Sequence, residues 1–186
     1  MAERENYICN TNKRLFYLSD NVDKTTIGKV CFNLLYLLQE DDETDKKEKD
    51  FKREPIKIYV NSFGGSVYDM WALIDIMLNS KTPIYTYCTG YAMSAGFQIF
   101  LAGEKRYVSK NATLLYHQLS MWTGGKYLDV CNVMQERERN QKDIEKYIMS
   151  RTNISQEKLN EVREKKIDWY IHSEDCEKLG IAEIMN

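Results

Sequence analysis

Two glycine-centred turns constrain the possible folds of this chain more than any other feature of its sequence. The first spans residues 61–66 (Asn-Ser-Phe-Gly-Gly-Ser), and the second spans residues 89–96 (Thr-Gly-Tyr-Ala-Met-Ser-Ala-Gly). Each turn follows a short segment with the composition of a β-strand, 56–60 and 83–88, and each precedes a segment with helical periodicity. Strands that alternate with helices in this way are typical of α/β domains, in which crossover connections join parallel strands.

Apolar residues at three- and four-residue spacings predict the helices, and short β-branched and aromatic runs predict the strands. Helices are expected at 25–38, 66–77, 94–101, 126–151, 155–165 and 173–179. Strands are expected at 56–60, 83–88, 107–108, 113–116 and 181–185. The expected helix caps are Thr25 or Thr26, Ser66 and Ser173 at N-termini, and Gly103 and Gly180 at C-termini.

Two polar segments interrupt this pattern. Residues 39–54 form a mixed-charge run, for which we expect a solvated extension of the first helix or a loop. The middle of the longest helix, 135–142, is almost wholly polar. This part is therefore expected to project from the body or to pack only at its ends.

The length and composition favour a single domain over residues 1–186. Aliphatic and aromatic residues make up 43% of the chain, and the formal net charge is -2, with both signs interleaved. These values exclude wholesale disorder, and the one-signed basic cluster of proteins that bind nucleic acid or acidic membranes is missing. No stretch reaches the ~18 apolar residues that span a membrane, so we expect neither a nucleic-acid partner nor a membrane.

The cysteines bear on metal binding and on the compartment. Cys9, Cys31, Cys88, Cys131 and Cys176 match neither the spacing of a zinc site nor that of a disulfide framework. We interpret them as reduced core thiols, which are typical of the cytoplasm. No metal site is expected from them.

The two turns also have features that acyl-transfer reactions require. A turn between a strand and a helix leaves backbone N–H groups without helical partners, and such donors stabilise the negative oxygen that forms during acyl transfer. Gly64 and Gly65 have no Cβ, which lets a substrate carbonyl approach the backbone closely. Ser94, between Gly90 and Gly96, lies where a sharp strand-to-helix turn would expose its hydroxyl group. Similar turns bind phosphate or no ligand in many α/β proteins, so either turn alone leaves the function open.

A serine hydroxyl needs a base, and the chain contains two histidines. His117 follows the expected strand 113–116 and begins a loop, from which it can reach a cleft, although a purely structural histidine is the alternative. For His172 a structural role is favoured. The imidazole needs an acceptor at its second nitrogen. Of the 28 acidic residues, Asp168 is the candidate because it adjoins Trp169–Tyr170, an aromatic segment that we expect to be buried.

In chain order, the two turns, the serine, the histidine and the late aspartate resemble the proteolytic subunits of the Clp protease, the ClpP family. The family motif Asn-Ser-Pro-Gly-Gly-Ser corresponds to 61–66, and its motif Gly-x-Ala-x-Ser-x-Gly corresponds to 90–96. Its His-Gln-Pro segment corresponds to 117–119, and its late aspartate corresponds to Asp168. The resemblance covers roughly residues 14–185.

The resemblance implies a ClpP/crotonase-like α/β fold, a spiral of ββα units with a protruding handle helix. It implies a serine endopeptidase that cleaves unfolded proteins and peptides through an acyl-enzyme, without a cofactor, inside a ring-shaped chamber. The implied catalytic residues are Ser94 as nucleophile, His117 as general base and Asp168 as its partner, with the amides of Gly65 and Ala95 as oxyanion hole. The implied substrate-binding residues are Gly64, Ser66, Val67, Gly124 and Gly125.

The resemblance also implies partners. The chain is expected to form a homo-oligomer, a heptameric ring or two such rings stacked through the handle helix, and to work with an AAA+ unfoldase of the Clp type. Phe63 and Leu119 replace prolines of the family motifs, and Ile167 stands where the family commonly has an arginine that ties ring assembly to activity. With the charged insertion at 41–54, these departures bear on ring assembly and unfoldase docking rather than on the positions of Ser94 and His117.

Two other functions stay open. A crotonase-type acyl-CoA enzyme holds a thioester enolate with paired amides, but it would need carboxylates near the glycine turns and no Ser-His pair. A catalytically silent subunit with a structural or regulatory role is the second alternative, and the presence of all three triad residues weighs against it.

Overall fold

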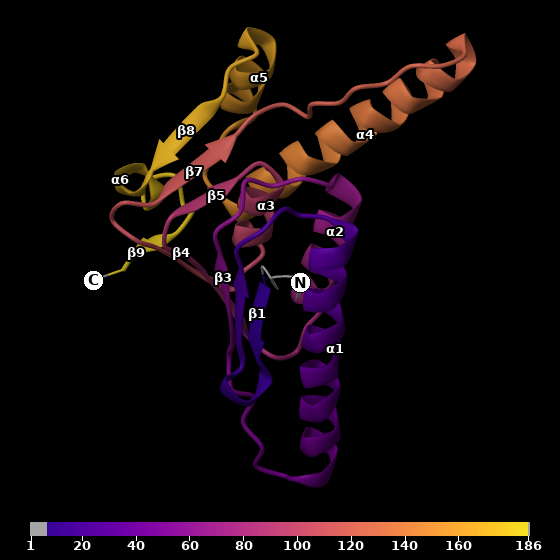
Figure 1. The fold of residues 1–186 in the computed structure, drawn as a ribbon. Coiled ribbons are helices and arrows are strands. Elements are labelled where there is room, and N and C mark those ends of the chain that lie inside the picture. Colours follow the sequence, from indigo (N-terminus) through magenta and orange to yellow (C-terminus); the bar gives the residue numbers. More distant parts are fainter. Residues whose placement is uncertain (1–6, 186) are drawn as a thin grey trace, which may run out of the picture.

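The computed structural model describes residues 7–185, which form two β-sheets with helices packed around them (Figure 1). In this part of the chain the larger sheet has the strand order β1-β2-β3-β4-β6-β9, and the smaller sheet has the order β5-β7-β8. The larger sheet contains β1 Tyr7–Asn10, β2 Leu15–Leu18, β3 Ile56–Val60, β4 Ile84–Cys88, β6 Lys105–Val108 and β9 Glu183–Ile184. The smaller sheet contains β5 Tyr91–Met93, β7 Thr113–Tyr116 and β8 Trp169–His172. Neighbouring strands are parallel except in the pairs β1–β2 and β7–β8, so the predicted α/β fold with parallel pairing is confirmed.

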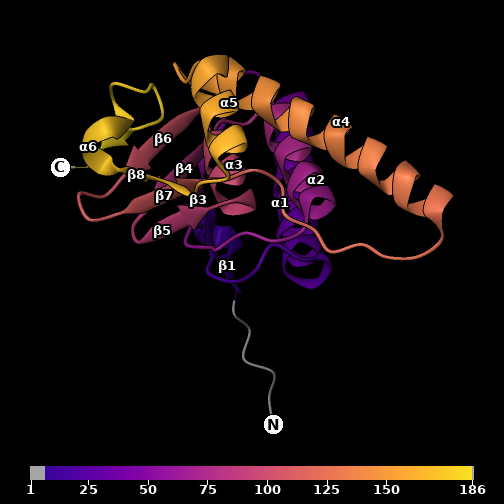
Figure 2. The same cartoon turned by 90° about the horizontal axis from the view of Figure 1, so that it is seen from above.

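The helices cover the larger sheet and support the smaller one. They are α1 Lys24–Lys47, α2 Val67–Leu78, α3 Ala95–Leu101, α4 Tyr127–Arg151, α5 Gln156–Lys165 and α6 Ser173–Cys176, with a 3-10 turn at Thr11–Lys13. α1 and α2 lie side by side along one face of the larger sheet (Figures 1 and 2). α3 is buried along its whole length, so the residue that precedes it is held on a rigid support. Within residues 7–185, no helix is both long enough and apolar enough to cross a membrane.

The central strands alternate in burial as their sequences predict. Ile58 and Val60 of β3 lie in the core, whereas the tyrosines of this sheet form a row of rings. Tyr59 and Tyr87 stack with their centroids 4.8 Å apart, and Tyr87 and Tyr107 stack with their centroids 5.0 Å apart. This row joins three neighbouring strands by side-chain contacts across the sheet.

The termini of two helices differ from the prediction. α1 is capped by Asp23, whose carboxylate accepts hydrogen bonds from the amides of Thr25 and Thr26 at 2.9 Å each, so neither threonine is the cap. A carboxylate next to unpaired helical amides also interacts favourably with the helix dipole. α6 is capped by His172 and not by Ser173, whose hydroxyl instead donates a hydrogen bond to the carbonyl of Lys110 at 2.6 Å.

Three other predicted caps have different outcomes. The cap Ser66 is confirmed, because its hydroxyl accepts a hydrogen bond from the Asp69 amide at 3.3 Å. Gly180 is not the C-cap of α6, because this helix ends at Cys176 with Glu177 as its cap; Gly180, with φ +64°, ends the turns that follow. Gly103 is not the cap of α3, because the C-cap is Ala102, in a right-handed conformation.

The C-terminal half of the long helix α4 packs against the body of the molecule, and its N-terminal half projects away from it (Figures 1 and 2). The prediction for its polar middle is correct for this half and wrong for Asn140 and Gln141, which are buried. Gln141 donates hydrogen bonds to the hydroxyl of Tyr116 at 3.0 Å and to Glu145 at 2.8 Å, and it accepts one from the Leu119 amide at 2.9 Å. At Asn140 and Gln141, hydrogen bonding therefore takes the place of apolar packing, whereas Ile144, Tyr147 and Ile148 pack the next turns of α4 into the core.

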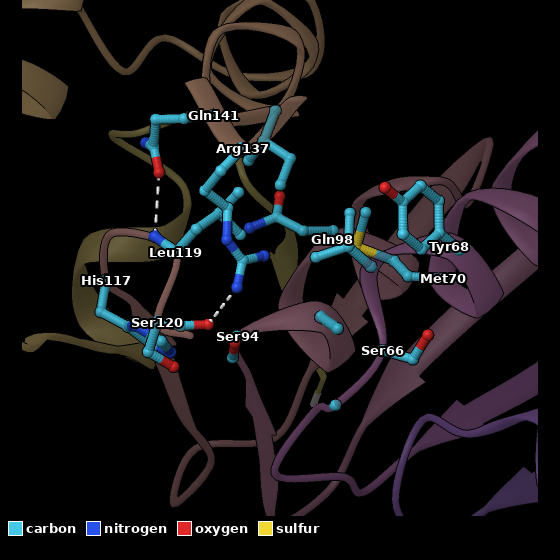
Figure 3. Close-up of a pocket in the computed structure, with 14 residues that line it drawn as sticks. Ser66, Tyr68, Met70, Ser94, Gln98, His117, Leu119, Ser120, Arg137 and Gln141 are labelled. Carbon is cyan, nitrogen blue, oxygen red and sulfur yellow. Dashed lines mark hydrogen bonds between the residues drawn. The ribbon is translucent and has the colours of Figure 1, made fainter. Parts of the chain in front are cut away.

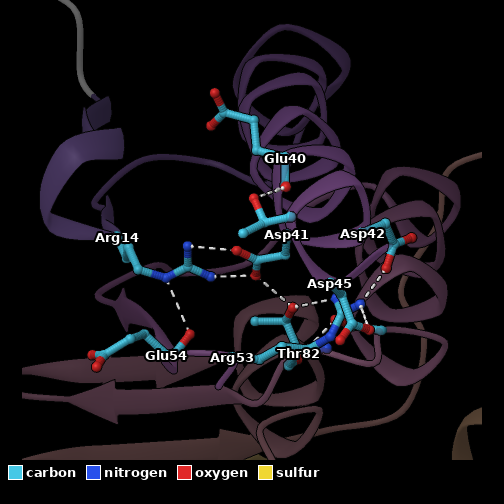
Figure 4. Close-up of polar contacts among 10 residues, drawn as sticks. Arg14, Glu40, Asp41, Asp42, Asp45, Arg53, Glu54 and Thr82 are labelled. Atoms are coloured by element: carbon cyan, nitrogen blue, oxygen red, sulfur yellow. Dashed lines mark hydrogen bonds and ion pairs between the residues drawn. The ribbon is translucent and has the colours of Figure 1, made fainter. Parts of the chain in front are cut away.

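The charged run 39–54 is tied to the body by ion pairs rather than solvated throughout (Figure 4). Its first part extends α1 to Lys47. Arg14 binds Asp41 through two hydrogen bonds of 3.0 and 2.6 Å, and the Thr82 hydroxyl donates a third to the same carboxylate at 2.6 Å. Nearby, Arg53 binds Asp42 at 2.6 Å, and this contact lowers the pKa of that carboxyl group.

Replacing Arg14 with methionine is expected to lower the free energy of unfolding by about 2–4 kcal/mol, because Asp41, at 4% exposed, would lose its cation. Urea denaturation followed by circular dichroism measures the change. Lys47→Met is the matched control, since it removes an exposed pair with Glu43 at 4.0 Å and should cost about 0.5 kcal/mol or less. An equal loss in the two variants would contradict the structural role of the Arg14 pair.

The cysteines match the predicted interpretation in part. All five are free, but only Cys88 and Cys176 are fully buried, and Cys9, Cys31 and Cys131 are half-buried. Desolvation raises the pKa of Cys88 and of Cys176 to about 12. These two thiols therefore behave as apolar core groups.

Candidate active site

Ser94 occupies the sharp turn between β5 and α3. Its backbone has φ 52° and ψ −123°, a conformation that residues with a side chain rarely adopt. The Ser94 amide donates a hydrogen bond to the carbonyl of Leu115 at 3.0 Å, and the Ser94 carbonyl accepts one from the Gln98 amide at 3.3 Å. The surrounding structure thus holds the strained turn, and the half-buried hydroxyl makes no hydrogen bond to other described residues.

The first glycine turn packs directly against the serine turn. Gly64 has φ +101°, and a Cβ on it would lie 2.7 Å from the carbonyl oxygen of Met93 and 2.8 Å from the amide nitrogen of Ala95. A Cβ on Gly65, which has φ +149°, would lie even closer to the carbonyl oxygen of Val22. Only residues without a side chain allow this approach.

Further contacts lock the two turns together. The amide of Met93 donates a hydrogen bond to the carbonyl of Ser62 at 2.9 Å, and the Ser62 amide donates one to the carbonyl of Tyr91 at 3.2 Å. The side-chain oxygen of Asn61 accepts a hydrogen bond from the Tyr91 amide at 3.1 Å. Phe63, which replaces the family proline, stacks on Tyr91 with a centroid distance of 4.2 Å. An aromatic contact therefore reinforces the turn at the position of the substitution.

The paired turns leave two amides available. No hydrogen bond within residues 7–185 uses the amide of Gly65 or of Ala95, and both residues line one cavity together with Ser94. Ala95 is the first residue of α3, so its amide also has the positive end of a buried helix behind it. Backbone amides without partners are the kind of donor from which an oxyanion hole is built.

His117 follows β7 and lines the same cavity, half-buried. Its Nδ1 atom lies 2.5 Å from the carbonyl oxygen of Gln118, a contact that requires a proton on Nδ1. Nε2 is then the nitrogen with a free lone pair, as a general base requires. The carbonyl of Gln118 thus fixes the tautomer of His117, a role that we expected for Asp168. No hydrogen bond joins Ser94 to His117 in the described chain.

Asp168 lies between α5 and β8 and is exposed. Of the aromatic segment that we expected to be buried, Trp169 is half-buried and packs against the core, whereas Tyr170 is exposed. The carboxylate makes no hydrogen bond or ion pair with the residues that the structure describes, and it does not line the cavity. β7 and β8 are antiparallel with Tyr116 opposite Trp169, so one further step along both strands sets Asp168 across from His117. Cross-strand neighbours of this kind share a face of the sheet. Continued by one residue, this register would bring Asp168 near the histidine, although no hydrogen bond or ion pair joins the two side chains in the described chain.

The predicted substrate-binding residues separate into two groups. Ser66 and Val67 line the cavity, and Gly64 supports it through its contact with the serine turn. Gly124 and Gly125 are exposed in the loop before α4 and do not line it.

The cavity has a volume of about 270 Å³ and extends behind Ser94 (Figure 3). Sequence reasoning missed most of its inner wall, which is formed by Tyr68, Met70, Gln98, Leu119, Ser120, Arg137, Gln141 and Ile144. Gln98 could have been predicted from the sequence as a cavity residue, because it lies four residues after Ser94 and therefore on the same face of the helix. Arg137 carries no such local signal, because it comes from the distant helix α4.

Comparison with known proteins gives a consistent result. A family model described as Clp protease matches residues 3–186. The ATP-dependent Clp protease proteolytic subunit 1 of Streptomyces avermitilis is 30% identical over 173 residues, which cover 92% of this chain and 74% of that relative. The subunit of the same name from Shouchella clausii is 28% identical over 172 residues, which cover 91% of this chain and 83% of the relative.

Among solved structures, a point mutant of ClpP1 from Listeria monocytogenes superposes with a TM-score of 0.78 at 23% identity. The match covers 95% of this chain and 93% of that chain. At this identity the likeness establishes the fold, and the predicted fold class is confirmed.

Proposed function

This chain belongs to the Clp protease family, and on that premise we propose that it hydrolyses peptide bonds through an acyl-enzyme on Ser94. The supporting observation is that Ser94, His117 and the free amides of Gly65 and Ala95 all border one cavity. They come from three separate places, the turn before α2, the N-terminus of α3 and the loop after β7, so their convergence is a property of the tertiary structure. A nucleophile, a base and paired amide donors together are what acyl transfer requires.

The proposed reaction has two stages. His117 Nε2 takes the proton of the Ser94 hydroxyl while the Ser94 oxygen attacks the scissile carbonyl carbon, and the oxyanion binds the amides of Gly65 and Ala95. The imidazolium then gives its proton to the leaving amine, and the peptide C–N bond breaks. In the second stage a water molecule loses a proton to His117 and attacks the ester, which releases the acid and returns the proton to Ser94.

Asp168 is proposed as the partner of the imidazolium. Support comes from the strand register, which sets it opposite His117. For the carboxylate to accept a hydrogen bond from Nδ1–H, the ring must exchange the Gln118 carbonyl for Asp168. Such a change suits an exposed carboxylate at the end of an edge strand, where little packing opposes it.

The proposal extends to substrate and assembly. An extended peptide would pair as an added strand with the backbone near 65–67 and 124–126. We propose one domain per subunit and a homo-oligomeric ring, heptameric or doubly so, that works in the cytoplasm with a Clp-type unfoldase on unfolded proteins. The projecting half of α4 and the loop before it support the ring, because they leave large apolar side chains such as Trp122, at 93% exposed, uncovered in the single chain.

The proposal predicts that a fluorophosphonate probe labels Ser94 covalently in the full chain. Mass spectrometry of the digested adduct identifies the labelled residue, and Ser94→Ala should remove the label. Ser150→Ala is the matched control and should keep it, since the Ser150 hydroxyl lies on α4 and donates a hydrogen bond to the carbonyl of Tyr147. A chain that folds and assembles but takes up no probe would favour the catalytically silent subunit instead.

A further inference from the structure

The cavity behind Ser94 has the position of a side-chain subsite. α2, α3 and α4 enclose it, and Gln98 lies one helical turn deeper than Ser94 on α3. A scissile carbonyl held between Ser94 and the amides of Gly65 and Ala95 would direct the side chain of its own residue, P1, into this space. The chemistry of the inner wall therefore determines which peptide bonds are cleaved.

Two buried polar atoms of this wall lack hydrogen-bond partners. The side-chain oxygen of Gln98 is one of them, and Gln98 as a whole is only 3% exposed. The Nε atom of Arg137 is the other. A buried donor and a buried acceptor without partners cost free energy in the empty site, and such groups in a cavity indicate a ligand that satisfies them.

Arg137 also gives the wall its charge. None of the other residues that line the cavity in the described chain is an acid, a lysine or a second arginine. Arg137 forms no ion pair within residues 7–185, and its one hydrogen bond donates from Nη2 to the carbonyl of Ser120 at 2.5 Å. Figure 3 shows its guanidinium above Ser94 and beside Gln98. Since a guanidinium carries five N–H donors, most of them remain available.

We propose that this cavity binds an acidic side chain, so that the chain cleaves after glutamate or aspartate. This inference rests on the proposed peptidase function and specifies its substrate. A carboxylate fits the guanidinium of Arg137 in a two-bond geometry and neutralises its charge. A half-turn of the Gln98 carboxamide exchanges its oxygen for its NH₂ group, which then donates to the same carboxylate.

Apolar side chains are the less favourable occupants. A leucine in this space would exclude water and leave both Arg137 Nε and the Gln98 carboxamide without partners. Sites built from hydrogen-bonding groups reject ligands that cannot pair with them far more strongly than apolar pockets reject polar ligands. Met70 and Ile144 would still contact the methylene groups of a glutamate.

The test compares three fluorogenic peptides that differ only at P1, with glutamate, glutamine or leucine. The expected order of kcat/KM for the full-length wild-type chain is glutamate, then glutamine, then leucine, with about 10- to 100-fold between the first and the last. Arg137→Met should abolish or invert this order. Arg139→Met is the matched control, because Arg139 lies two residues along α4 and pairs with exposed Glu136, and it should keep the order.

The ratio of kcat/KM between the peptides is the decisive quantity, because partial unfolding of Arg137→Met would lower kcat/KM for all three peptides together. A wild-type preference for leucine, equal rates with glutamate and glutamine, or an unchanged ratio in Arg137→Met would each overturn the inference. Fluorophosphonate labelling of Ser94 in the same samples separates this failure from a failure of the proposed function. If turnover is too slow to measure, fluorescence anisotropy of the three peptides on Ser94→Ala gives the same comparison as binding affinities.

Discussion

Replacing His117 with alanine is expected to lower the rate of peptide hydrolysis by about 10⁴-fold or more, because Ser94 would lose the base that takes its proton. Substrate binding should change far less, since the cavity behind Ser94 stays intact. The measurement is kcat and KM for a fluorogenic peptide, with the assembly state of the variant checked by its mass in solution. The amides of Gly65 and Ala95 would account for the residual rate.

His172→Ala is the matched control for this prediction. His172 is the chain's other histidine, and it is exposed at the end of β8. We expect its replacement to leave the rate near that of the wild type. If His117→Ala kept its activity while His172→Ala lost it, the base would have to be reassigned.

Replacing Gly64 with alanine is expected to destabilise the chain by about 2–5 kcal/mol and to abolish labelling of Ser94 by a fluorophosphonate. The new Cβ would meet the carbonyl oxygen of Met93 at 2.7 Å, and an alanine at φ +101° is strained in addition. The serine turn can relieve the clash only by moving away, which separates Ser94 from the amide of Gly65. Thermal unfolding and probe uptake measure the two effects.

Gly28→Ala is the matched control for this substitution. Gly28 lies within α1, where an added Cβ would meet no atom within 4 Å. Because alanine favours the helix, this variant should gain about 0.5–1 kcal/mol of stability and keep full labelling. Labelling of Gly64→Ala at the wild-type rate would show that the close contact between the turns is not needed for reactivity.

Local sequence signals predicted most of the elements correctly. The alternation at 56–60 and the capping serine Ser66 are confirmed, because both depend on contacts between residues close in the chain. β1 and β2 were missed. Their hairpin turns through Arg14 in the left-handed conformation, φ 52°, without the glycine or Asn-Gly pair that usually marks such a turn. The bidentate pair of Arg14 with Asp41 accounts for this placement, and it joins positions 27 residues apart.

For the candidate site, the sequence by itself determined the residue types and where each one stands: two glycine turns, a serine on a strand-to-helix turn and a histidine at a strand end. Turn chemistry and helix capping act over a few residues, so they are encoded locally. Only the tertiary structure decided that Gly64 lies against the serine turn, that Asp168 is exposed just beyond the paired ends of β7 and β8, and that Arg137 and Gln98 line the cavity behind Ser94. Those relations depend on the packing of helices and sheets distant in the chain, and the burial and pairing of a polar group are properties of that packing rather than of its neighbours in sequence.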